Sequence, residues 1–245
     1  MSDAPFSPAS RGRLTSYDLG RFPGDTLFDR IARAVCEAGC LPRKELYEAW
    51  EVARRTRRVF RGGRVIDLGA GHGLLAHILL LLDDSSQSAM VVDAALPPSA
   101  ARLHEVLTTH WPRLSGRISF VAGGPEDVEV EPTDVVVSCH GCGAFTDAIL
   151  ERAIRSRARV AVLPCCHDLG TCDAGNLTGW LDPALAIDVV RAMRLTAQGY
   201  RVRTQTIPGG ITPKNRLLLG EPHYTVTAPP SRRPAGSAGS RFEVQ

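Results

Sequence analysis

The sequence has little that would place it in a membrane or bind it to a polyanion through bulk charge. No apolar run approaches the roughly 20 residues that cross a bilayer, and the N-terminal stretch lacks the apolar block of a secretory signal. The formal net charge is only +3, so bulk charge requires neither a nucleic acid nor a membrane as partner. We therefore expect a cytoplasmic protein without a membrane partner.

The seven cysteines lack the arrangement of a disulfide framework. Their number is odd and no export signal accompanies them, so we expect free thiols. The repeated C-x(2–4)-C spacing of structural zinc sites is also absent. A length of 245 residues with 44% hydrophobic content fits one large α/β domain with an ample core.

The chain is organised around residues 64–76, RVIDLGAGHGLLA, where an apolar run meets three alternating glycines and then becomes helical. The run predicts a buried parallel strand and the glycines its turn. Gly69, Gly71 and Gly73 allow positive φ angles and close approach of a ligand, and the following helix N-terminus offers free N–H groups. The stretch predicts a nucleotide-type site, the alternative being a turn that only joins strand to helix.

The spacing differs from the dinucleotide fingerprint G-x-G-x-x-G, because the third glycine comes one residue early and Asp67 precedes the first by two. This pattern, D-x-G-x-G-x-G, resembles the first motif of the class I methyltransferases that bind S-adenosylmethionine. The resemblance implies that Asp67 lies near the methionyl ammonium of that cofactor. It also implies that Gly69, Ala70, Gly71 and Gly73 form the cofactor loop.

The order of apolar segments predicts an α/β fold, a Rossmann-like doubly wound sheet of seven strands, mostly parallel, with an antiparallel last strand. Helices precede it at the N-terminus. The expected strands are near residues 64–68, 89–93, 118–121, 134–138, 159–163, 200–207 and 216–219. The expected divisions are a flexible arm (1–24), N-terminal helices packed on the core (25–62), the S-adenosylmethionine-binding methyltransferase domain (63–227) and a disordered tail (228–245).

Further cofactor contacts are expected where later strands end. Asp93, followed by Ala94, ends the second strand, where an acid can accept both ribose hydroxyls of an adenosine. The resemblance implies that Glu126 or Asp127, after the third strand, contacts the adenine amino group; the alternative for them is a plain helix cap. Cys139, at the end of the fourth strand, completes the expected cofactor set.

Two Cys/His clusters follow the fourth and fifth strands, whose carboxyl ends are neighbours in a doubly wound sheet. The clusters contain Cys139, His140, Cys142, Cys165, Cys166 and His167. Three interpretations stay open: a metal site, a thiolate nucleophile activated by histidine, or buried packing cysteines beside histidines that line the pocket. No metal ligand is assigned.

The clusters carry a second resemblance. Residues 139–147, CHGCGAFTD, and 164–167, PCCH, resemble a methyltransferase branch with the motifs H-x-C-G-x-x-T-D and C-C-H-H. That branch includes a eukaryotic tRNA ribose 2′-O-methyltransferase. The resemblance implies methyl transfer to a nucleophilic oxygen or nitrogen, and His140 and His167 are candidate bases with Asp168 as orienter.

The acceptor is less defined, with RNA, specifically tRNA, slightly favoured. Arg54, Arg55, Arg57 and Arg58 end the second predicted helix and could contact phosphates; a solvated helix end matched to the helix dipole is the alternative. A small-molecule or protein methyltransferase, and a regulator that binds the cofactor without turnover, are the alternative functions.

Overall fold

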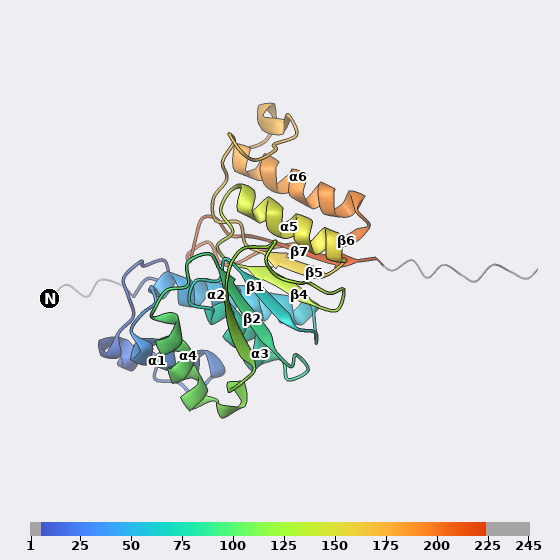
Figure 1. Ribbon diagram of the computed structural model, residues 1–245. Helices are drawn as coiled ribbons and strands as arrows, with labels where there is room; N and C mark the ends of the chain where they lie inside the picture. The colour runs from blue at the N-terminus through green and yellow to red at the C-terminus, as the bar shows by residue number, and fades with distance from the viewer. Residues whose placement is uncertain (1–5, 224–245) are drawn as a thin grey trace, which may run out of the picture.

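A seven-stranded sheet with helices on both faces forms the body of the protein in the computed structural model, which describes residues 6–223 (Figure 1). The strand order is β3-β2-β1-β4-β5-β7-β6. The strands are β1 (Val65–Leu68), β2 (Ala89–Asp93), β3 (Ile118–Ala122), β4 (Val135–Ser138), β5 (Arg159–Val162), β6 (Tyr200–Thr206) and β7 (Arg216–Pro222). All neighbours pair in parallel except β7, which is antiparallel to β5 and β6, so the predicted fold class is confirmed.

The helices lie in two groups (Figure 1). They are α1 (Leu27–Ala38), α2 (Arg43–Val59), α3 (Leu74–Leu82), α4 (Ala100–His110), α5 (Ala144–Ser156) and α6 (Pro183–Ala197). Local signals set several ends: Thr26 caps α1 by accepting from Asp29 N, and Asp182 caps α6 by accepting from Leu185 N. Among the described residues, no helix is both long and apolar enough to span a bilayer.

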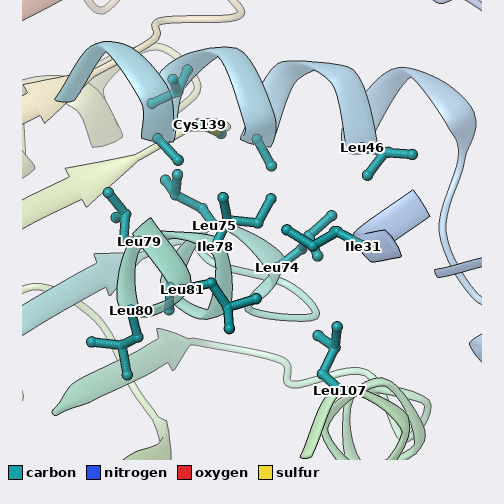
Figure 2. Close-up of a cluster of buried hydrophobic side chains, with 14 of the residues drawn as sticks. Ile31, Leu46, Leu74, Leu75, Ile78, Leu79, Leu80, Leu81, Leu107 and Cys139 are labelled. Carbon is teal, nitrogen blue, oxygen red and sulfur yellow. The ribbon is translucent and has the colours of Figure 1, made fainter. Parts of the chain in front are cut away.

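Side chains of the inner strands alternate between two cores. Val135 and Val137 of β4 belong to the core that contains α1 to α4, whereas Val136 belongs to the core under α5 and α6. Because β4 is buried on both faces, its sequence is a continuous apolar run. In Figure 2 the side chains of α3 fill the space beside α2, with Leu46 of α2 and Leu107 of α4 at its borders.

The N-terminal segment, expected as a flexible arm over residues 1–24, contributes to the core where the structure describes it. Leu14 and Phe22 are 0% and 2% exposed, and Leu14 N donates to Leu41 O. Arg33 of α1 donates to the carbonyls of Phe22 and Gly24. Residues 1–5 of that arm and the expected disordered tail, 228–245, lie outside the described residues.

Truncation of Phe22 tests this packing. Phe22→Ala should lower the free energy of unfolding by about 3 kcal/mol, because it leaves a cavity among α1 residues. Tyr17→Ala is the control, since Tyr17 is 97% exposed and its loss should cost less than about 0.5 kcal/mol. Urea unfolding measures the free energy of unfolding of both variants. Equal losses for the two variants would contradict the packing of Phe22 in the core.

Candidate functional site

The glycine loop between β1 and α3 uses its three glycines differently. Gly69, Gly71 and Gly73 all have positive φ, at 65°, 52° and 75°. A Cβ on Gly69 would lie 2.7 Å from the Phe145 ring, and one on Gly73 would lie 2.6 Å from Val91. A Cβ on Gly71 would meet nothing within 4 Å. Two glycines therefore permit tight packing, whereas Gly71 presents bare backbone to open space.

Asp67, at the end of β1, is a buried carboxylate, 1% exposed. Its Oδ2 accepts from Ala76 N of α3 at 3.2 Å, and within residues 6–223 it forms no ion pair with a cation. Burial raises the pKa of Asp67 to about 8, and the Asp93 charge adds to the shift. A cationic group placed beside Asp67 would therefore be stabilised.

A small cavity of about 30 Å³ lies at this loop. It is lined by Leu41, Glu45, Ala49, Asp67, Gly69, Ala70, His72, Leu74, Leu75, Cys139 and His140. Such a volume admits only the narrow end of a ligand. The structure thus brings Asp67, the loop, Cys139 and His140 together, as the sequence predicts for them.

Asp93, at the end of β2, lies beside the same loop. Its Oδ2 accepts from Gly71 N at 2.8 Å, and its Oδ1 accepts from Ala95 N at 3.0 Å. Ala94 follows it and is exposed. Because each carboxylate oxygen has two lone pairs, Asp93 can hold the loop and still accept from hydroxyl groups next to Gly71.

Glu126 and Asp127 lie in the loop after β3. Asp127 Oδ2 accepts from Gly124 N at 2.8 Å and closes a turn, and no helix begins there, so the helix-cap alternative is wrong. Glu126 pairs with Arg155 of α5 at 2.6 Å. Neither carboxylate lines the small cavity at the glycine loop.

His77 and His104, to which the sequence analysis assigns no role, support the glycine loop. His77 of α3 is fully buried, its Nδ1 lies 2.7 Å from Gly73 O, and its Nε2 lies 3.0 Å from Nδ1 of His104. Burial lowers the pKa of His77 to about 4, so the ring is neutral at neutral pH. Only the placement of His77 one turn after Gly73 signals this contact in the sequence.

The two candidate bases have different surroundings. His140 lines the cavity beside Asp67, and burial lowers its pKa. The His167 side chain is 3% exposed, and its Nε2 lies 2.7 Å from Asp188 Oδ1 of α6. Cys139 between strand and cavity is buried, which raises the pKa of its thiol strongly.

The prediction that Asp168 orients a histidine is wrong, because Asp168 accepts from Gly170 N and Thr171 Oγ1 within its own loop. Asp188 of α6 contacts the His167 imidazole instead, since α6 packs beside the loop after β5. Burial alone would raise the pKa of Asp188, but hydrogen bonds from His167 and Arg216 hold it below its ordinary value.

Arg191, one turn after Asp188, is a further residue to which the sequence analysis gives no role at the site. It is 1% exposed and forms a bidentate pair with Asp147 of α5, with both N–O distances at 2.9 Å. It also donates to Gly143 O at 2.8 Å. Asp147, at the end of the motif 139–147, therefore joins α6 to the segment that follows β4. The sequence signal for a charged pair on α6 was the three-residue spacing of Asp188 and Arg191.

The six candidate metal ligands separate in the structure. Cys142, Cys165 and Cys166 have sulfur atoms that all lie within 4.8 Å of one another. Cys139, His140 and His167 do not belong to this group. Burial raises the pKa of Cys165, the least exposed of the three.

A larger cavity of about 480 Å³ lies between α6 and strands β6 and β7. Pro164, Asp188 and Arg216 line it at the carboxyl edge of β5, and the remaining lining is mostly apolar. Asp188, which holds His167, therefore forms part of its wall.

The arginine cluster of α2 is only partly available to a phosphate. Arg57 is 2% exposed, donates to Leu79 O and Ser86 Oγ, and pairs with Asp83, so its predicted RNA contact is wrong. Arg54 and Arg55 both pair with Glu51, whereas Arg58 is exposed.

A family model described as a methyltransferase domain matches residues 44–171, just over half of the chain. The glutathione S-transferase C-terminal domain-containing protein homolog of Drosophila melanogaster is 25% identical over 202 aligned residues, covering 65% of this chain and 33% of that protein. The chain thus spans about a third of the length of this curated relative.

Solved structures that are similar to this chain include two methyltransferases. The S-adenosylmethionine-dependent methyltransferase SibL is 20% identical, with a TM-score of 0.50 and coverage of 86% of this chain and 67% of that chain. The mitomycin 7-O-methyltransferase MmcR is 19% identical, with a TM-score of 0.49 and coverage of 86% and 64%.

The raised pKa of Asp67 makes stability depend on pH. The folded state keeps the proton from pH 3.8 up to about 8 while the unfolded state has lost it, so stability falls as pH rises through this range. Asp67→Asn should flatten that part of the urea-unfolding profile. Asp168→Asn, in an exposed loop, is the control, and parallel profiles for wild type and Asp67→Asn would contradict the burial argument.

Proposed function

This chain belongs to the methyltransferase-domain family, and on that premise we propose that it transfers a methyl group from S-adenosylmethionine to a nucleophilic oxygen or nitrogen. The observation that carries the proposal is the bare backbone of Gly71, which donates its N–H to the Asp93 carboxylate and follows Asp67 by four residues. Asp67 is a buried carboxylate with no cation partner among residues 6–223. A ligand with one cationic end and a ribose matches that arrangement.

The residues present fit this cofactor. Asp67 would compensate the methionyl ammonium, which in turn would favour the ionised carboxylate. Gly69, Ala70 and Cys139 would line the narrow cavity around that end. Asp93 would accept from the ribose hydroxyls.

Two contacts at the adenosine end are proposed on the family resemblance. Ala94 would lie beside the adenosine, and Glu126 or Asp127 would contact the adenine amino group. Both carboxylates already hold protein groups, Arg155 and Gly124 N, so either contact would share or replace a bond.

S-Adenosylmethionine supplies a methyl group on a positively charged sulfur, which becomes neutral as the methyl group leaves. The protein's task is to align the acceptor and to remove its proton where it carries one. His140 is the better-placed base, because it lines the cavity beside Asp67 and its lowered pKa keeps it neutral at neutral pH. His167 is held by Asp188 at Nε2, and we propose that it positions the loop after β5.

For the acceptor we propose a small molecule with an apolar body, bound in the 480 Å³ cavity beside β6, β7 and α6. That cavity and the glycine loop lie at the same carboxyl edge of the sheet, and the ion pair of Arg216 with Asp188 forms the polar part of its wall. RNA, favoured slightly by the sequence, is the second candidate, and the observation for it is the surface formed by Arg54, Arg55 and Arg58.

Gly71→Ala tests the cofactor site. A methyl group there would enter the space left open for the ligand, so the Kd for S-adenosylmethionine should rise at least tenfold, about 1.4 kcal/mol. Gly116→Ala is the matched control, because Gly116 also has positive φ and nothing within 4 Å of its Cβ position, but lies in a turn before β3. Calorimetry measures both; no binding by wild type, or equal effects of the two changes, contradicts the proposal.

Label transfer with methyl-labelled cofactor tests the acceptor. Cell fractions of RNA, protein and metabolites are incubated separately with the enzyme, and we expect the metabolite fraction to take up label. Wild-type cofactor binding without label in any fraction would instead support a regulator without turnover.

The RNA alternative has its own test. If RNA binds at α2, Arg54→Ala with Arg58→Ala should weaken tRNA binding and reduce the slope of log K against log salt by about 2, since each phosphate contact contributes about 1. Arg55 keeps its pair with Glu51 in this variant. Arg201→Ala with Arg203→Ala removes the same charge from exposed positions of β6, and equal behaviour of the two variants removes the RNA alternative.

A further inference from the structure

Three thiols outside both cavities lie close enough to bind one metal ion. Cys142 Sγ is 2.9 Å from Cys165 Sγ, and Cys165 Sγ is 3.8 Å from Cys166 Sγ. The three sulfur atoms all lie within 4.8 Å of one another, and none of these residues lines the cavities at the glycine loop or at α6. Nothing in the proposed methyl transfer uses them.

The backbone holds these thiols together. Cys142 follows β4 and Cys166 follows β5, and the two residues form a parallel bridge just beyond the paired strands. Gly143 N donates to Cys166 O at 3.2 Å, and Arg191 holds Gly143 O from the other side. The sulfur atoms are therefore brought together by the fold before any ligand binds, which reduces the entropy cost of binding.

The spacing suits a tetrahedral thiolate site. Zn–S bonds of about 2.3 Å place two sulfur ligands of a tetrahedral zinc about 3.8 Å apart. The Cys165–Cys166 pair already has that separation, 3.8 Å. The Cys142–Cys165 pair is shorter, and Cys142, whose residue is exposed, would move outward on binding.

We propose that Cys142, Cys165 and Cys166 form a three-thiolate site for a thiophilic cation, Zn²⁺. Thiolates are the ligands that zinc and other soft metals prefer over magnesium or calcium. Each thiol would release its proton to solvent as its sulfur bonds to the metal, and the fourth position would face solvent, because Cys142 and Cys166 are exposed.

The metal would join the loops that follow β4 and β5. His140 lies two residues before Cys142, and His167 directly follows Cys166. A bond between these loops would fix the separation of the two histidines. The site does not depend on the proposed function, since it rests only on the thiol geometry.

Cobalt substitution tests the site in the full-length protein, expressed without a metal-affinity tag and kept reduced. Elemental analysis should find one equivalent of zinc. After the metal is removed with a chelator, Co²⁺ should restore one equivalent and produce a thiolate-to-cobalt charge-transfer band. Cys142→Ser, Cys165→Ser and Cys166→Ser should each weaken or abolish the band, and the triple variant should lose it.

Cys40→Ser is the matched control, because Cys40 is a free, partly exposed thiol that packs against the core containing α1 to α4, outside the three-thiol group, and its loss should leave the band unchanged. Circular dichroism checks that each variant folds. If the triple variant does not fold, the cobalt bands of the single variants decide whether the three thiols bind the metal. The proposal is overturned if wild type gives no thiolate band, or if the triple variant binds cobalt as wild type does. A mass two hydrogens lower, with no metal in any preparation, would assign the 2.9 Å pair to a disulfide and also overturn it.

Discussion

Parallel pairing of β2, β1, β4 and β5 is the constraint on which the candidate site depends. Val65 of β1 is paired with Ala89 of β2 and with Val135 of β4, so the strands end close to the same level. The glycine loop, Asp93 and His140 therefore meet at one edge, although they lie far apart in the sequence. Strands β1 and β4 are buried on both faces, so a shift in their register would misplace the whole set.

A network of polar side chains around the buried Arg191 and the largely buried Asp188 then determines how α6 sits on this edge. Arg191 holds Asp147 and Gly143 O, and Asp188 holds His167 and Arg216. Buried ion pairs often add little net stability, but removal of one partner is costly, because the other charge stays buried without compensation. The network therefore specifies one position for the loops after β4 and β5 more than it stabilises the fold.

Much of the fold could be predicted from the sequence, because the signals were local. Continuous apolar runs indicated the doubly buried strands, and the caps that the structure shows at Thr26 and Asp182 involve only neighbouring residues. The placement of Asp67 and the glycines followed for the same reason, since one short segment contains strand, turn and helix. The structure adds that, of these three glycines, Gly71 is the one with open space around its Cβ position.

The errors concern residues whose surroundings come from distant segments. Arg57 belongs to a basic cluster in the sequence, and nothing local separates it from its neighbours. The way α2 packs on α3 nevertheless directs its side chain inward, to Leu79 O and Asp83. Asp168 adjoined His167 in sequence, yet Asp188 reaches the imidazole from α6. The packing of Phe22 likewise depends on α1, not on the composition of its own segment.

The sequence by itself determined where the strands lie along the chain, where the glycine turn falls and which acids stand near the ends of β1 and β2. Each of these features is set by chemistry within a few residues. Only the tertiary structure decided which of six Cys and His side chains lie together, which arginines are buried and which carboxylate holds a histidine. The physical reason is that such contacts depend on how whole helices dock on the sheet, and docking is set by the sum of both cores.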